Sequence, residues 1–364
     1  MKNGLLICHG VFKEKNIGDY IQSVAQEQFL DHVDCYVERE QLNTFQSDEK
    51  VNTIMNAWFM HHPENFPPST SINPLYISFH ISEKIADKLL TPKTIAHLKE
   101  HIPIGCRDTA TRDLLQQHGI DSYFSGCLTM TLGRKYLSKE KDDTIYFVDP
   151  YYELGGKRYG LSNKKILFNS IKLLIRHWNK VRSMKNFTFD VTPYLERFPY
   201  CLIRPLMCAS FYDAYSKIFS DDILFSAKFL MHRVSVVPFA NEEERMEYAR
   251  NMVRTYARAK LVVTSRLHCA LPCLGVETPV IFVNSDAMIE GKVRSAGRFG
   301  GNLELLHVLK WTNKGIVAES DEIKNILTKG KISTNLLLKN KETYKELRDK
   351  LVNCVDLFFK KQND

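Results

Sequence analysis

The sequence lacks any long uncharged apolar run, although 44% of its 364 residues are hydrophobic. The apolar stretch at residues 4–8 is too short for the hydrophobic region of a secretion signal, and no other run reaches the length of a membrane span. Internal repeats and low-complexity segments are also missing from the sequence. We therefore expect a globular protein in the cytoplasm. The membrane association that we expect is peripheral contact with the inner membrane surface.

Two common cofactor motifs are missing as well. The nine cysteines include no Cys-x-x-Cys pair, and no Cys/His cluster has the spacing of a zinc site. The sequence contains no Gly-x-Gly-x-x-Gly fingerprint for a dinucleotide. We expect neither a metal nor a resident cofactor, and we interpret the cysteines as small buried residues in a reducing compartment.

Positive charge is only mildly in excess, with a formal net charge of +8. This excess fits an anionic small substrate, an anionic membrane surface or nucleic acid. A nucleic-acid-binding protein usually concentrates its charge more strongly, so we do not expect a nucleic-acid partner. Basic residues do gather at 151–233, where they form either solvated helix faces or a surface toward the acceptor or a membrane.

Short apolar runs alternate with segments of helical spacing. The runs predict strands at residues 5–8, 35–37, 54–59, 75–79, 102–106, 145–148, 234–238, 261–264 and 279–283. Helices are predicted at residues 20–30, from 91 onward, and at 109–118, 241–260, 267–274 and 340–361. This alternation indicates an α/β fold with parallel sheets and helices on both faces.

The chain length suits two domains. We expect an N-terminal domain at residues 1–142 and a C-terminal domain at residues 143–320. A mostly helical, basic insertion is expected at about 151–233, within the second domain. The segment 321–364 is predicted to end in an amphipathic helix that packs back across the domains.

The strongest local signal for chemistry lies at residues 262–270, where a β-branched run leads directly into a helix. Arg266 and His268 then lie at the carboxyl end of a strand and the start of a helix, where open α/β sheets bind ligands. Helix amides and a guanidinium favour a carboxylate or phosphate there, and the imidazole can carry a proton. The alternative is that Arg266 pairs with a structural carboxylate.

Three other segments carry candidate binding groups. Gly18 and Asp19 follow the first strand, where Asp19 either caps a helix or acts on a sugar hydroxyl. Arg107 follows another strand and is a candidate anion ligand, while His80 ends a further strand at the rim of the same cleft. A basic loop at 286–302 either closes over a phosphate or is an exposed connection, and it contains Lys292, Arg294 and Arg298.

The run Ser265-Arg266-Leu267-His268, with Ala270-Leu271 and Pro279-Val280-Ile281 after it, resembles the signature of polysaccharide pyruvyl transferases. The early Gly18-Asp19 segment and the Arg107-Asp108 pair are similar to motifs of the same family. The resemblance extends over roughly residues 5–290.

This resemblance implies two Rossmann-like domains that face a central cleft, as in GT-B glycosyltransferases. It implies phosphoenolpyruvate as the donor substrate, a pyruvate ketal on a sugar as the product, and no obligatory metal. The sugar acceptor belongs to a polysaccharide or a lipid-linked precursor. His268, Arg266 and Asp19 are then the expected catalytic residues. Two alternatives stay open: a GT-B glycosyltransferase that uses a nucleotide sugar, and a non-catalytic protein that binds a phosphorylated ligand.

Overall fold

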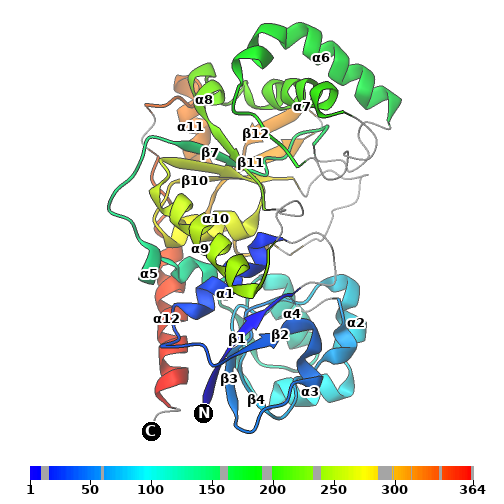
Figure 1. Cartoon of the computed structure of the whole chain (residues 1–364), viewed down its shortest axis with the longest axis vertical. Coiled ribbons are helices and arrows are strands. Elements are labelled where there is room, and N and C mark those ends of the chain that lie inside the picture. The colour runs from blue at the N-terminus through cyan, green and yellow to red at the C-terminus, as the bar shows by residue number, and fades with distance from the viewer. Residues whose placement is uncertain are drawn as a thin grey trace.

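The computed structural model describes residues 1–9, 16–58, 61–155, 163–190, 199–232, 239–285, 297, 299–312, 314–335 and 338–361. Two main sheets lie in the lower and upper halves of the view, with helices between and around them (Figure 1). Nearly all strand pairs are parallel, which confirms the predicted α/β class.

The N-terminal sheet has the order β2-β1-β3-β4 and is parallel throughout. Its strands are β1 Lys2–Ile7, β2 Cys35–Glu38, β3 Val51–Ile54 and β4 Ile72–Leu75. A two-stranded parallel sheet of β5 Ile104–Cys106 and β6 Ser122–Phe124 follows. The α-helices of this part are α1 Ile17–Glu27, α2 Ala86–Leu89, α3 Pro92–Lys99, α4 Thr109–Gln117 and α5 Gly133–Tyr136.

The C-terminal sheet has the order β12-β11-β10-β9-β7-β8. Its strands are β7 Ile145–Val148, β8 Lys228–Leu230, β9 Leu261–Thr264, β10 Val280–Asn284, β11 His307–Thr312 and β12 Gly315–Ala318. The edge pair β11 and β12 is antiparallel and was not predicted. The helices are α6 Lys164–Ser183, α7 Tyr200–Tyr215, α8 Asp221–Ser226, α9 Glu242–Arg258, α10 Leu267–Gly275, α11 Asp321–Lys329 and α12 Tyr344–Lys360.

Two predicted strands of the N-terminal sheet are wrong in position. Strand β3 precedes the predicted run at 54–59. The prediction missed it because this fully buried strand contains Asn52 and Thr53, so it is not a continuous apolar run. Asn52 is satisfied by Asn73 Nδ2, which donates to its Oδ1 at 2.7 Å. Strand β4 ends before most of the predicted run at 75–79, where Ser78 has a φ of +55° that interrupts extended backbone. The predicted strand at 234–238 lies outside the described residues.

Helix ends follow the capping residues. Helix α1 begins at Ile17, earlier than predicted, because Asn16 is the N-cap and its side chain accepts a bond from Gly18 N at 3.2 Å. Asp19 therefore lies in the first turn and is not the cap. Helix α9 has the predicted cap Asn241, and the turn after α4 contains Gly119 with a φ of +69°.

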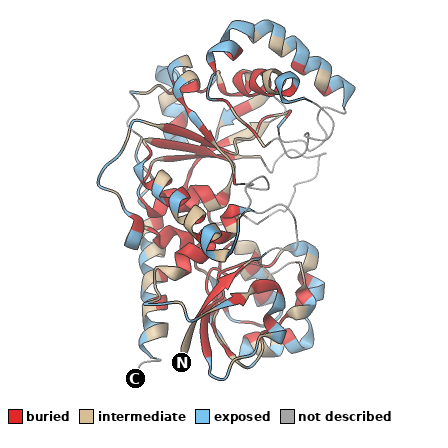
Figure 2. Cartoon of the chain, in the orientation of Figure 1, coloured by how far each residue is buried: buried red, intermediate tan, exposed pale blue. Residues whose placement is uncertain are grey.

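One cluster of buried apolar side chains is shared by the N-terminal and C-terminal elements. It extends from β1 and α1 to α9, α10 and α12, and includes Leu5, Ile21, Met246, Leu271 and Leu351. Buried segments run through the middle of the molecule in the same view (Figure 2). Helices α6, α7 and α8 complete a separate cluster beside β7 and β8. None of the described helices has the length and apolar character needed to cross a membrane.

Candidate active site

The candidate site begins where the ends of two strands from different parts of the chain approach each other. Arg107 follows β5, and His268 is the second residue of α10, just after β9. Arg107 Nη1 lies 3.5 Å from His268 Nε2. The guanidinium can donate to His268 Nε2 only while that nitrogen carries no proton, which is the form in which the imidazole can accept one. A cation and a proton carrier that are 161 positions apart in sequence thus share one site.

Arg107 is a constrained cation. Its side chain is 6% exposed, and its Nε is a buried donor with no hydrogen-bond partner in the part of the chain that the structure describes. The backbone is held as well, because Asn302 Nδ2 donates to Arg107 O at 2.9 Å. An unused buried donor is costly unless a ligand or water accepts from it, which marks Arg107 as a candidate anion ligand.

Gly18 allows α1 to approach this site closely. A Cβ atom at position 18 would lie 3.2 Å from both His268 Cβ and His232 Nδ1. The first turn of α1 is also tied to the segment after β8, because Ile17 N donates to His232 O at 2.8 Å. A Cβ at Gly18 would require these neighbours to shift by a few tenths of an ångström, so glycine is favoured here for space and not for its backbone freedom.

Arg266 is the N-cap residue of α10 and contacts a carboxylate. Its Nε donates to Asp149 Oδ2 at 2.8 Å, and the same oxygen accepts from His232 N at 3.2 Å. Asp149 has a φ of +42°, an unusual conformation for a residue other than glycine. The side chain of Arg266 is 39% exposed, so its guanidinium reaches solvent beyond the ion pair. The pairing with a carboxylate that the sequence left open is therefore present, together with an accessible cation.

His80 is buried and does not lie at an open rim. It is 5% exposed, and its Nδ1 lies 2.6 Å from Asp108 Oδ2. Asp108 is the N-cap of α4 and also accepts from Thr111 N at 3.0 Å. Burial alone raises the pKa of Asp108, but the hydrogen bond and charge of His80 and the charge of Arg107 outweigh it and lower the pKa. His80 and Asp108 thus form a buried ion pair beside Arg107.

Replacing Asp108 by asparagine is expected to cost roughly 3–5 kcal/mol of unfolding free energy at neutral pH, because His80 and Arg107 lose a buried partner. Asparagine is an equally good cap, so α4 itself is preserved. The lowered pKa of Asp108 stabilises the fold above its ordinary value of 3.8, and this contribution is lost as the pH falls through the folded-state value. Urea unfolding should therefore show a difference that shrinks in acid. Asp113→Asn, at an exposed carboxylate, is the control, and an equal loss there would contradict the assignment.

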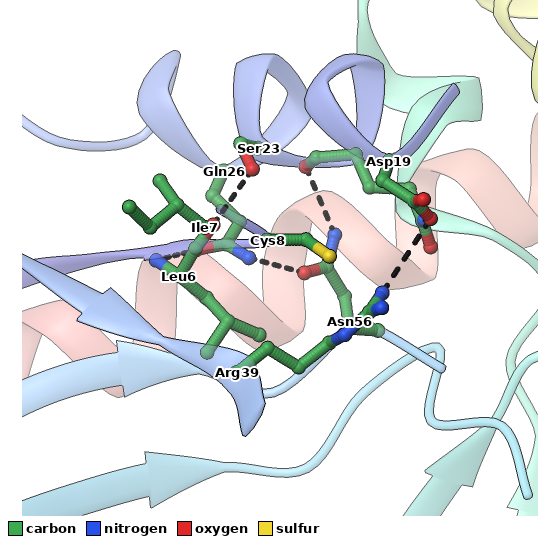
Figure 3. A pocket seen from close by; sticks show the side chains of 10 residues that line it. Leu6, Ile7, Cys8, Asp19, Ser23, Gln26, Arg39 and Asn56 are labelled. Carbon is green, nitrogen blue, oxygen red and sulfur yellow. Dashed lines mark hydrogen bonds and ion pairs between the residues drawn. The ribbon is translucent and has the colours of Figure 1, made fainter. Parts of the chain in front are cut away.

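Asp19 lines a small polar pocket at the end of β1. Its Oδ1 lies 3.4 Å from both Arg39 Nη1 and Gln22 Nε2, and Figure 3 shows Asp19 and Arg39 on opposite sides of the pocket. Arg39 is 3% exposed and also contacts Glu40 at 3.0 Å. The pocket has a free volume of about 10 Å³, which is room for about one water and not for a sugar ring.

A cluster of buried polar side chains underlies the site. His232 Nε2 lies 2.8 Å from the hydroxyl of Tyr256, and both contact Cys269 of α10. Burial raises the pKa of Cys269, but hydrogen bonds from Cys273, His232 and Tyr256 outweigh it and lower that pKa. The nine cysteines form no disulfide, and five of them are buried, Cys269 and Cys273 among them.

Sequence reasoning named Asp108 only as part of the Arg107-Asp108 motif, without its contact with His80. It missed three other partners of the predicted residues: Asp149, Arg39 and His232. Each is distant in sequence from the predicted residue that it contacts. Lys292, Arg294 and Arg298 of the predicted basic loop lie outside the described residues.

A metal ligand set that was not predicted exists elsewhere. The donor atoms of His97, Glu100 and His101 lie within 4.8 Å of one another at the end of α3. His97 Nε2 already contacts the hydroxyl of Tyr76 at 2.7 Å, and burial together with the charge of His101 lowers the pKa of His97 to about 4. Helix α3 lies at the lower end of the molecule, whereas α10 lies in its middle (Figure 1). This group is separate from the Arg107–His268 site.

Comparison with protein families finds a match that covers more than half of the chain. The family model for polysaccharide pyruvyl transferase matches residues 78–287, more than half of the 364 residues. The matched span contains His80, Arg107, Arg266 and His268, and it begins after Gly18 and Asp19. No curated protein matches the chain. Because the family model covers most of the chain, including both strand ends that meet at Arg107 and His268, the chain belongs to the polysaccharide pyruvyl transferase family.

Proposed function

We propose that this protein transfers the pyruvyl group of phosphoenolpyruvate to two hydroxyls of a sugar and releases phosphate. The sugar belongs to a polysaccharide or to a lipid-linked glycan precursor. Family membership supports a transferase of this kind. The observation that carries the proposal is the 3.5 Å contact between Arg107 Nη1 and His268 Nε2, which combines an anion ligand with a proton carrier.

The donor is a small molecule with two anionic groups, and the site offers two guanidinium groups. Arg107 Nε lies 3.6 Å from Asp108 Oδ2 and makes no hydrogen bond among the described residues. Arg266 is accessible at the start of α10, a helix without a side-chain cap. Guanidinium groups match carboxylate and phosphate geometry, and the amides of a helix start add further donors. In this proposal one arginine holds the carboxylate and the other the phosphate, and Lys292, Arg294 and Arg298 are further candidates for the phosphate.

The proposed reaction is an addition followed by a substitution at the same carbon. His268 delivers a proton to the methylene carbon of phosphoenolpyruvate, which becomes a methyl group and leaves C2 electron-poor. The first sugar hydroxyl adds to C2 and gives up its proton, with the imidazole as acceptor. The second hydroxyl then displaces phosphate from C2, and its proton leaves with the phosphate. The product is a cyclic pyruvate ketal.

We assign Asp19 to the acceptor side as an orienting group. Its Oδ1 lies within reach of Arg39 and Gln22, so it is a fixed acceptor for a sugar hydroxyl. The pocket beside it admits a hydroxyl but not a ring. The proposal assigns residues 1–142 to the acceptor side and 143–320 to the donor side of a GT-B-like pair of domains, with 321–364 as a connecting segment.

The proposal is tested with the full chain and phosphoenolpyruvate, against a panel of synthetic and lipid-linked glycosides. Phosphate release that depends on the acceptor, together with a mass increase of the glycan by one pyruvyl group, is the expected result. Release of a nucleotide from a sugar nucleotide would instead identify a glycosyltransferase. Thermal stabilisation by phosphoenolpyruvate without any phosphate release would identify a non-catalytic binding protein.

A further inference from the structure

Helix α6 exposes a row of large apolar side chains. Phe168, Ile171, Ile175 and Trp178 are 61%, 41%, 74% and 51% exposed. They are spaced by three, four and three residues. Phe168, Ile171 and Ile175 lie on one side of the helix before His177, whose φ of −108° and ψ of 17° kink it, and Trp178 continues the stripe after the kink. The buried side of α6 is formed instead by Ile166, Ser170 and Val181, so the stripe is not part of the core.

The charge of α6 is of one sign. The helix has 20 residues, of which six are basic and none is acidic. The basic residues are Lys164, Lys165, Lys172, Arg176, Lys180 and Arg182. Among the described residues, Lys180 is the one of these six with an ion-pair partner, Asp221 at 2.5 Å.

The cations border the apolar stripe. On a helical projection of 100° per residue, Lys165, Lys172 and Arg176 fall along one flank of the stripe, and Lys172 Nζ lies 4.5 Å from the centre of the Phe168 ring. Lys164 lies in line with the stripe at its N-terminal end, and Arg182 follows the kink at His177. Long basic side chains can extend their charges from such positions toward lipid headgroups while the apolar groups enter the bilayer.

Helix α6 is well placed to contact a flat surface. It lies at the upper outer edge of the molecule, and its outward side is exposed along most of its length (Figures 1 and 2). The part of α6 before the kink at His177 extends about 20 Å at the usual rise per residue. An exposed apolar stripe bordered by cations and without acidic residues is typical of helices that lie in the interface of an anionic membrane.

We propose that the α6 face, defined as Phe168, Ile171, Ile175, Trp178 and the flanking cations, docks this protein on an anionic lipid bilayer. Two alternatives fit less well. A solvated face has no physical reason to carry four large apolar groups in a row. A second copy of the chain would place one basic face against another, which repel. Docking of this kind is independent of the transfer reaction, because it needs neither the donor nor the acceptor.

The test is co-sedimentation of the full chain with vesicles of phosphatidylcholine, with and without phosphatidylglycerol. Binding is expected only when phosphatidylglycerol is present, and it should weaken as salt is raised. Ile175→Glu should reduce partitioning by about tenfold or more, because a carboxylate replaces an inserted apolar group. Leu357→Glu, at an apolar residue of α12 that is 56% exposed, is the matched control and should bind like the unaltered protein.

Charge is tested separately with Lys165→Gln, Lys172→Gln and Arg176→Gln together. The loss should be about fivefold for each cation removed. The control removes three exposed lysines elsewhere, Lys84, Lys88 and Lys93, and should have little effect. Equal losses in the two triple variants would mean that binding depends only on the overall charge of the protein. That result would overturn the assignment to α6.

Trp178 provides a direct readout of insertion. Its emission should shift to shorter wavelength on binding, and Trp178→Phe should lose most of that shift while vesicle binding persists. No preference for phosphatidylglycerol vesicles, or normal binding by Ile175→Glu, would refute the proposal. A solution mass of twice the monomer that Ile175→Glu abolishes, without vesicle binding, would instead assign the face to self-association.

Discussion

Replacing His268 by alanine is expected to reduce pyruvyl transfer by about 10²–10⁴-fold, the usual contribution of a general acid or base. The imidazole lies 3.5 Å from Arg107 Nη1 and near the first turn of α1, so a donor held by Arg107 lies within reach of its Nε2. The loss should appear in turnover, while the KM for phosphoenolpyruvate changes little. Phosphate release measured at saturating donor and acceptor concentrations gives both quantities.

The control for this variant is His118→Ala, at an exposed histidine after α4. Both variants should unfold at the same temperature as the unaltered protein, because His268 is only half-buried and its removal leaves α10 intact. Turnover by His268→Ala within about threefold of the unaltered enzyme would remove the imidazole from the proton transfers. The proposed mechanism would then need another proton donor near C2.

Replacing Arg266 by lysine should raise the KM for phosphoenolpyruvate by about tenfold to a hundredfold. A guanidinium can keep its Nε bond to Asp149 at 2.8 Å and still direct its two Nη groups toward an anion. A single ammonium cannot do both. The expected size corresponds to one charge-assisted hydrogen bond, worth about 1.5–3 kcal/mol. Initial rates over a range of donor concentrations, at a saturating acceptor concentration, provide the measurement.

Arg112→Lys is the matched control, because Arg112 pairs with its neighbour Asp113 at the surface of α4. It should leave the KM unchanged. An unchanged KM in Arg266→Lys, combined with a lowered unfolding temperature, would mean that Arg266 serves mainly to hold Asp149. Such a result would leave Arg107 as the main anion ligand and would not affect the prediction for His268.

Much of the fold in the C-terminal half could be predicted from local sequence. The strand at Leu261–Thr264, the helix at Leu267–Gly275 and the cap Asn241 of α9 were predicted almost to the residue. Buried parallel strands there are continuous apolar runs, and capping residues act locally, so both leave signals in a short window. Strand β3 gave no such signal because it contains the polar residue Asn52, which is paired within the sheet. Strands β11 and β12 gave none either, and β12 lies at the edge of the sheet, where less apolar surface is needed.

The sequence by itself determined the α/β class, the placement of Arg266 and His268 at a strand-to-helix junction, and the resemblance to the family that matches residues 78–287. Only the tertiary structure decided which side chains these residues contact. Arg107 contacts His268 across 161 positions, Arg266 pairs with Asp149, and Asp19 contacts Arg39. Backbone propensity and capping act over a few residues, whereas ion pairs depend on how distant elements pack. The residues of the site could therefore be predicted from the sequence, whereas the contacts that they make could not.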